Sequence, residues 1–157
     1  MTKFLDANVF IYAFYKAKKK KLDPTAKALK ILAKDIIRKI SKGEEKAVTS
    51  VVHLSEICNI VKQSLSIIDV ASLMNSIITA KHIDVVDVTV ELYKNAIAIG
   101  LNYGLEPNDA LAVIIMKQLN IKDIYTFDRD FDAVEWLRRH PTDEQIKKMI
   151  EKIEKTH

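Results

Sequence analysis

Four acidic side chains stand beside apolar segments at widely separated places in the chain. Asp6 follows a short apolar run, Glu56 lies within an apolar stretch that begins near residue 47, Asp109 opens another, and Asp128 ends a fourth. A carboxylate in such a place is costly to desolvate unless a cation or hydrogen-bond donors meet it. Four such placements predict one shared cation site, so divalent metal chemistry is the first hypothesis.

Each acid alone also has an ordinary structural interpretation. Asp6 suits the N-cap of a following helix, and Asp109 is favoured at a helix amino terminus by the helix dipole. Glu56 could be a solvated glutamate, and Asp128 could belong to a turn. Asp109 makes the strongest single case because its side of the helix is apolar throughout. The case for Glu56 depends on the other three acids.

Polar neighbours of these acids extend the candidate site. Thr126, Asp128 and Asp130 offer the oxygen ligands that a hydrated Mg²⁺ or Mn²⁺ ion prefers. We expect Asp128 at the site and Asp130 as an outer partner or alternate ligand. Asn8 could orient Asp6 or a metal-bound water, and it could equally be the helix cap.

Other chemistries fit the sequence less well. The four histidines lack zinc-ligand spacing, and the single Cys58 has no second thiol for a metal or a disulfide. Three glycines form no phosphate-binding loop, and no GxSxG motif is present. The sequence therefore disfavours zinc, nucleotide-binding and serine-hydrolase interpretations.

Strands and helices alternate along the chain, and this alternation would position the acids. Predicted strands cover residues 4–5, 47–52, 82–88, 123–127 and 133–137. Segment 9–15 is a helix or an extended apolar run. Helices are predicted from Pro24 to Gly43, around Glu56, and over 66–80, 89–103, 107–119 and 142–157, the last opened by a Thr142–Gln145 capping box.

Such alternation predicts right-handed crossovers and a parallel sheet between helical layers. Ligands of open parallel sheets bind outside the carboxyl ends of the strands, near the switch in strand order. Asp6 and Asp128 follow two predicted strands, and Glu56 and Asp109 lie on helices at the same rim. The sequence therefore places all four acids at one edge of the sheet.

The composition indicates one globular domain. The chain has 157 residues, 48% of them hydrophobic and 29% charged, enough for a continuous core. No signal-peptide pattern or membrane-length apolar run occurs, so the sequence predicts a cytoplasmic protein. The clumped lysines, including Lys16, Lys18 and Lys19, could face phosphates, and they could equally be a solvated helix end.

The chain resembles the PIN-domain nucleases, and most closely the VapC-type ribonuclease toxins of prokaryotic toxin–antitoxin pairs. The motifs that carry the resemblance are FLDAN, TSVVHLSE, PNDALA and TFDRDF, in this order, and the likeness spans roughly Thr2 to Leu137. It implies a three-layer α/β/α sandwich with a central, mainly parallel sheet of about five strands. Residues 1–140 would form the nuclease domain and 141–157 a charged helix that packs on the body or on a partner.

The resemblance also implies the chemistry and the partners. Asp6, Glu56, Asp109 and Asp128 would be the catalytic, metal-binding acids, supported by Asn8 and Thr126. One or two Mg²⁺ or Mn²⁺ ions would then serve hydrolysis of RNA phosphodiester bonds. Candidate contacts to the RNA backbone are Lys16, Lys18, Lys19 and Arg129. A homodimer and a cognate antitoxin are the partners implied.

Two features depart from the family pattern, namely the long segment from Lys16 to about Lys42 and the charged carboxyl-terminal helix. Both bear on toxin status and on substrate choice. Besides a toxin, the sequence therefore allows a housekeeping RNA-processing nuclease. A non-catalytic RNA-binding or scaffold module is the alternative from another class, and the complete set of four acids argues against it. A purely structural protein would require four independent coincidences.

Overall fold

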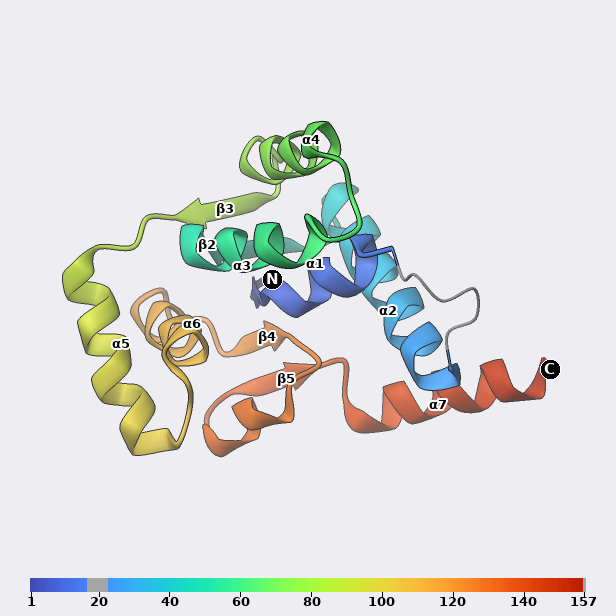
Figure 1. Ribbon diagram of the computed structural model, residues 1–157. Coiled ribbons are helices and arrows are strands. Elements are labelled where there is room, and N and C mark those ends of the chain that lie inside the picture. Colours follow the sequence, from blue (N-terminus) through green and yellow to red (C-terminus); the bar gives the residue numbers. More distant parts are fainter. Residues whose placement is uncertain (17–22, 157) are drawn as a thin grey trace.

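A single five-stranded sheet organises the molecule. The computed structural model describes residues 1–16 and 23–156 (Figure 1). All strand pairs are parallel, in the order β3-β2-β1-β4-β5. The strands are β1 (Thr2–Leu5), β2 (Lys46–Ser50), β3 (Ile83–Val86), β4 (Asp123–Tyr125) and β5 (Arg138–His140).

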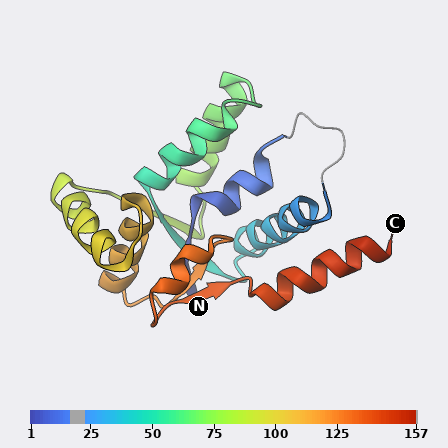
Figure 2. The same ribbon diagram turned by 60° about the horizontal axis from the view of Figure 1, so that its bottom comes forward.

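Helices cover both faces of this sheet (Figures 1 and 2). They are α1 (Ala7–Phe14), α2 (Pro24–Ser41), α3 (Val51–Val61), α4 (Ile67–Ile78), α5 (Val90–Tyr103), α6 (Pro107–Gln118) and α7 (Asp143–Lys155), with the 3-10 helix η1 (Arg129–Ala133). The helices α1 to α4 pack on one face, and α5 and α6 pack together on the other. The predicted three-layer α/β/α sandwich with a parallel sheet is confirmed.

Alternation along the strands divides the core between the two faces. Phe4 and Ile124 point into the core formed with α5 and α6, whereas Leu5 and Tyr125 point into the core formed with α1 to α4. These four residues are paired in register across β1 and β4. The two central strands are therefore buried on both faces, as expected for a parallel sheet.

The switch in strand order lies between β1 and β4. The chain moves from β1 outward through β2 and β3, and then returns to place β4 on the other side of β1. Asp6 ends β1 and donates its backbone N–H to the Tyr125 carbonyl at 3.0 Å, so the residues that follow β1 and β4 meet. Loops at this point of an open sheet form the usual ligand crevice.

One predicted strand is wrong. Residues 133–137 were expected to form the fifth strand, but Ala133 ends η1 and the chain then turns until Arg138 begins β5. Phe131 and Val134 are 0% and 1% exposed, and the Val134 N–H bonds to the Phe131 carbonyl at 3.0 Å. Phe131 and Val134 are three residues apart, and the tight turn buries both side chains. An apolar segment in a turn was therefore predicted as a strand.

The segments that depart from the family pattern pack against each other. In the described part of 16–42, α2 lies along α1 and α7. The ammonium group of Lys30 caps the end of α1 by donating to the carbonyls of Tyr12, Ala13 and Tyr15 at 3.2, 3.4 and 3.1 Å. The predicted Thr142–Gln145 capping box opens α7. Among the described residues, no helix combines the length and the apolar character needed to cross a membrane.

Candidate metal centre

Asp6 is fixed at the switch point by two neighbours. It is 5% exposed and lies directly after β1. Its carboxylate accepts from the Ala7 N–H at 2.8 Å and from the Thr126 hydroxyl at 2.7 Å. The cap interpretation is therefore correct, yet the second oxygen of Asp6 is held by a residue 120 positions away.

Asn8 and Thr126 join the loops after β1 and β4. The Asn8 amide donates to Thr126 Oγ1 at 3.1 Å and accepts from the Phe127 N–H at 3.3 Å. Thr126 Oγ1 also accepts from the Asp128 N–H at 3.1 Å. The supporting pair named from the sequence thus contacts both Asp6 and the backbone of Asp128.

The carboxylates of Asp109, Asp128 and Asp130 lie closest together. One oxygen from each residue lies within 4.8 Å of the other two, a spacing suited to one shared cation. Asp109 stands in the first turn of α6, and Asp128 caps η1 by accepting from the Asp130 N–H at 2.9 Å. Asp130, expected as an outer partner or an alternate ligand, belongs to this group.

Glu56 stands in the middle of α3, outside this group of three. Its carboxylate is repelled by Asp6 and Glu106, and the nearby side chain of Asn108 acts to lower its pKa. Asn108 in turn accepts from the Tyr93 hydroxyl at 2.5 Å. The other three acids predicted from the sequence, Asp6, Glu56 and Asp128, therefore lie within electrostatic reach of Asp109.

The crowding of these acids is visible in their pKa values. Burial, followed by repulsion from Asp6 and Glu106, raises the pKa of Asp109 to about 8 and that of Glu56 to about 7. Burial raises the pKa of Asp6 to about 6, although its bonds to Thr126 and Ala7 act in the opposite direction. No cationic group of the described residues is among the main causes of these three pKa values.

Three residues of this region were missed in the sequence. Glu106 caps α6 by accepting from the Asp109 N–H at 3.2 Å, and its charge acts on Asp6, Glu56 and Asp109. Standing just before Pro107, it has the pattern of an ordinary helix start. Asn108 and Tyr93 gave no signal at all, because their link to Glu56 depends on how α5 packs against α6.

A buried histidine lies beneath the acids. His53 is 0% exposed, and its Nδ1 lies 2.6 Å from the hydroxyl of Ser50, the residue that caps α3. Burial lowers the pKa of His53 to about 4, and a weak approach to the Asn108 carbonyl opposes this only in part. Its Nε2 makes no well-formed hydrogen bond within the described residues. His53 is therefore neutral and adds no positive charge to the site.

The basic residues named from the sequence are less central than expected. Lys18 and Lys19 lie outside the described residues. Lys16 follows the far end of α1, where its N–H bonds to the Ser64 hydroxyl at 3.1 Å. The guanidinium of Arg129 is 76% exposed and lies 3.4 Å from Asp143. Contacts of these residues with an RNA backbone stay a prediction.

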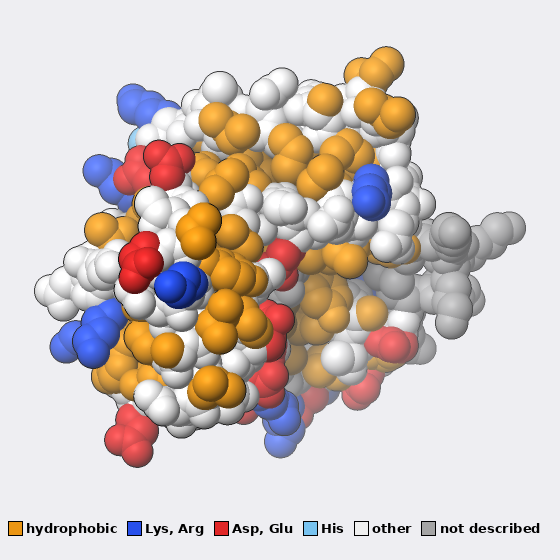
Figure 3. Space-filling view, turned by 60° about the vertical axis from the view of Figure 1, so that its left-hand side comes forward, with side chains coloured by type: hydrophobic (Ala, Val, Ile, Leu, Met, Phe, Trp, Pro, Cys, Tyr) orange, Lys and Arg blue, Asp and Glu red, His pale blue; other side chains and the backbone are white. Residues whose placement is uncertain are grey.

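The surface around the acids is largely apolar. On the face shown in Figure 3, acidic side chains line a hollow between apolar areas. The helix α5 on this side exposes Val90 and Leu101 at 80% and 82%, and α3 exposes Val51 at 47%. An approaching ligand would therefore meet apolar surface on both sides of the acids.

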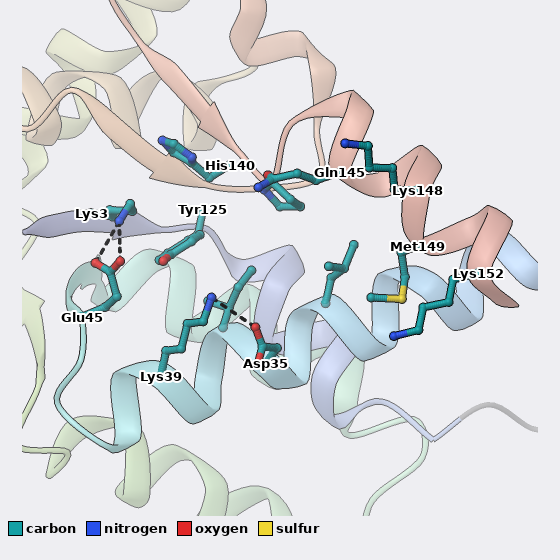
Figure 4. A pocket seen from close by; sticks show the side chains of 13 residues that line it. Lys3, Asp35, Lys39, Glu45, Tyr125, His140, Gln145, Lys148, Met149 and Lys152 are labelled. Carbon is teal, nitrogen blue, oxygen red and sulfur yellow. Dashed lines mark hydrogen bonds and ion pairs between the residues drawn. The ribbon is translucent and has the colours of Figure 1, made fainter.

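A large cavity elsewhere is not part of this site. It measures about 500 Å³ and lies between α2, α7 and the sheet (Figure 4). Its lysines are largely neutralised by acids of the chain, since Lys3 pairs with Glu45 at 2.8 Å and Lys39 with Asp35 at 3.3 Å. Its lining contains none of the four predicted acids.

The donors at the switch point fit a hard divalent cation. They are carboxylates and neutral oxygens, with no thiol and no accessible imidazole among the residues described there. Mg²⁺ and Mn²⁺ prefer such ligands. Asp6, Glu56, Asp109, Asp128 and Asp130 are the side chains that would hold the ion.

Solved structures share this fold at low sequence identity. The VapC20 sarcin-ricin loop cleaving toxin of Mycobacterium tuberculosis is 19% identical with a TM-score of 0.64, over 86% of this chain and 95% of that one. The VapBC2 structure from Rickettsia felis, bound to a promoter DNA fragment, is 17% identical with a TM-score of 0.58, over 89% and 98%. PAE2754 of Pyrobaculum aerophilum is 11% identical with a TM-score of 0.55, over 99% and 96%.

The sequence itself gives the family. No curated protein matches it as a relative. The PIN domain model, however, matches residues 3–137, a span that contains every acid of the candidate metal centre. The chain therefore belongs to the PIN-domain family.

Proposed function

We propose that the chain is a metal-dependent endoribonuclease that hydrolyses RNA phosphodiester bonds with Mg²⁺ or Mn²⁺. The observation that carries the proposal is the convergence of Asp6, Glu56, Asp109 and Asp128 from four separate elements. Burial and mutual repulsion raise the pKa values of three of them. A folded chain keeps such an arrangement at a cost in stability, and a bound divalent cation would remove that cost.

The chemistry follows from the positions of the acids. A divalent cation at such a site activates water and stabilises negative charge on the phosphate and the leaving oxygen. The chain contributes a fixed ligand at Asp6, because the Thr126 hydroxyl and the Ala7 N–H hold its two carboxylate oxygens. The apolar surroundings strengthen the electrostatic interactions made at the site.

Similarity to known structures supports RNA as the substrate and a toxin role. VapC20 cleaves the sarcin-ricin loop, and VapBC2 is a pair in which the structure contains promoter DNA. By analogy, this chain would be the toxin of a toxin–antitoxin pair, neutralised by a cognate antitoxin. The sequence identities are 17–19%, so the analogy supports the proposal through the shared fold.

Cleavage assays test the enzymatic part. Purified protein is incubated with single-stranded RNA and a matched DNA, with Mn²⁺ or Mg²⁺ or with chelator. We expect RNA cleavage that chelator abolishes and that falls at least about 100-fold in Asp6→Asn and Asp109→Asn, because several kcal/mol depend on the cation. Asp69→Asn is the control, since Asp69 lies in the first turn of α4 as Asp109 does in α6, but is exposed.

The alternatives give different results in the same assay. Cleavage that survives both chelation and substitution would contradict the metal mechanism. RNA that is bound in the presence of metal but never cleaved would indicate a non-catalytic RNA-binding module instead.

The toxin role needs a separate test. Expression of the wild-type chain in a bacterial host should stop growth, and Asp109→Asn should relieve the arrest. Co-expression of a small protein encoded immediately upstream should relieve it as well. A host that grows normally while the purified enzyme cleaves RNA would favour a processing nuclease.

A homodimer is also part of the proposal. The described surface exposes large apolar side chains, with Ile67 at 89%, Ile68 at 80% and Leu101 at 82%. Exposed apolar groups of this kind mark interfaces when they are contiguous. Light scattering of the purified protein should give twice the monomer mass, and a monomer at all concentrations would contradict the dimer.

A further inference from the structure

An apolar pocket lies between α1, α2 and the carboxyl-terminal part of α3. It measures about 480 Å³, within the range of about 300–1,000 Å³ that small-molecule and cofactor sites occupy. Its described lining combines Tyr12 and Tyr15 with Lys16, Lys30 and aliphatic side chains that include Ile60. Two aromatic rings and two cations therefore border a largely apolar space.

The helix register places this pocket close to the acids. On α1, Tyr12 follows Asn8 by four residues. On α3, Ile60 follows Glu56 by the same interval. Residues four apart share one face of a helix and lie about one turn, or about 5.4 Å, apart along its axis. The pocket is thus reached from the candidate metal centre within one helical turn. On the face shown in Figure 3, an apolar area likewise lies directly beside the acidic hollow.

An aromatic pair joins the pocket to the loop after β4. The rings of Tyr12 and Phe127 meet edge to face, with their centroids 5.3 Å apart. Phe127 comes directly before Asp128, and its N–H bonds to the side chain of Asn8. Tyr12 itself is 36% exposed and borders the pocket. An exposed ring in such a place resembles the aromatic side chains on which unpaired bases stack.

We propose that this pocket binds an unpaired base of the RNA, next to the phosphate that is cleaved, and that Tyr12 stacks on that base. The inference rests on the proposed function and deepens it, because a paired base stays within its duplex and a single-stranded substrate is required. The ammonium of Lys30 is taken up by three carbonyls at the end of α1. This leaves Lys16 as the cation of the described lining for an adjoining phosphate.

Cleavage kinetics test the stack. Tyr12→Leu keeps an apolar side chain but removes the ring, so kcat/KM on single-stranded RNA should fall about 10-fold. Tyr12→Phe keeps the ring and should cleave within about two-fold of wild type. The matched control is Tyr103→Leu, which should have no effect. Tyr103 is also 36% exposed, but it lies beside Met116 and Lys117, at the far end of α6 from Asp109.

RNAs that lack single bases identify the ligand. Once the cleaved bond is mapped, each base near it is removed in turn. At one position, loss of the base should lower the wild-type kcat/KM about 10-fold and should cost Tyr12→Leu nothing further, because both changes remove the same stack. Equal losses in the two proteins at every position would overturn the proposal.

Mn²⁺ affinity separates base binding from an effect on the metal centre. Tyr12 touches Phe127 beside Asp128, so the same variants are titrated with Mn²⁺. Base binding predicts the wild-type affinity in Tyr12→Leu. Weaker Mn²⁺ binding that accounts for the lost cleavage would show that Tyr12 acts through Phe127, and the proposal would be wrong. If Tyr12→Leu does not fold, Ile60→Ser takes its place in both tests, from the α3 wall of the pocket.

The remaining outcomes are also decisive. If wild type and all variants cleave RNA equally well, the pocket binds no base while the proposed function stands. If Tyr12→Leu cleaves normally but escapes inhibition by the protein encoded upstream, the pocket binds that protein and not RNA. If wild type cleaves no RNA, the proposed function and this inference fall together.

Discussion

Two aspartates of nearly equal exposure lie at the ends of neighbouring strands, but the charges around them differ. Asp6 follows β1 and is 5% exposed, whereas Asp123 begins β4 and is 6% exposed. Asp123 accepts two hydrogen bonds from Arg138 at 3.0 and 2.9 Å, and His140 Nε2 lies 2.7 Å away. Asp6 receives only a hydroxyl and a backbone N–H, and it faces other acids.

The pKa values follow this difference. Burial alone would raise the pKa of Asp123, but Arg138 and His140 outweigh it and hold that pKa below 3.8. Burial raises the pKa of Asp6 to about 6. Asp123 is paired with Arg138 of β5, the edge strand, whereas Asp6 follows β1, the central strand. Among the described residues, the chain thus gives cationic partners to Asp123 and none to Asp6.

The largest expected effect is on the pH dependence of stability without metal. Asp6, Glu56 and Asp109 have folded-state pKa values above their ordinary ones, so the folded state holds more protons than the unfolded state from about pH 4 upward. The free energy of unfolding should therefore fall as pH rises from about 4 to about 8, by about 2.5 kcal/mol from Asp6 alone.

Asp123 acts on the other side of this range. Its lowered pKa stabilises the fold above about pH 4, and that contribution is lost as the pH falls further. Urea unfolding in chelator should thus show maximal stability near about pH 4. A stability that stays level or increases up to about pH 8 would contradict the contrast between the two sites.

Breaking the neutralised site should lower stability. Asp123→Asn leaves Arg138 and His140 without their buried partner, and we expect a loss of about 2 kcal/mol near neutral pH. This is below the cost of fully buried pairs, because the side chain of Arg138 is 63% exposed. The control is Asp132→Asn. It disrupts the ion pair between Arg139 and Asp132, in which the side chain of Asp132 is 55% exposed. Equal, small losses in both variants would show that Asp123 is not specially stabilised.

Removing one charge from the acidic cluster should raise stability, by less than Asp123→Asn lowers it. Asp109→Asn removes a charge that has no cation near it, so the metal-free melting temperature at about pH 8 should rise by roughly 3 °C after allowance for solvent screening. The gain should be smaller at about pH 5 and vanish below about pH 4, where Asp109 is protonated in both the folded and the unfolded state. Asp69→Asn, at the matching helix position, should give no gain. A lower melting temperature in Asp109→Asn would indicate that Asp109 acts as a structural cap.

Much of this contrast was predictable from the sequence. Asp6, Glu56, Asp109 and Asp128 follow or adjoin elements whose alternation predicts a parallel sheet, and that topology alone brings them to one rim. The Thr142–Gln145 capping box was equally predictable, because it depends only on local spacing. The metal-binding roles of the four acids stay predictions.

The rest depends on contacts between distant elements. Glu106 has the local pattern of a helix cap, so its charge at the site emerges only once α6 is placed against α3. The Tyr93–Asn108 bond joins two helices, and nothing in either segment signals it. The prediction of a strand at residues 133–137 was wrong for a related reason. A tight turn and a short strand that are both rich in apolar residues have similar composition.

The most direct test of the account is thermal unfolding of wild type and Asp109→Asn over increasing Mn²⁺ at about pH 8. The wild-type melting temperature should rise steeply with Mn²⁺, because the ion supplies the charge that the chain lacks at Asp6, Glu56 and Asp109. Asp109→Asn should start higher and respond little. A wild-type protein that does not respond to Mn²⁺, or two proteins that respond equally, would contradict the claim that this cluster is a cation site.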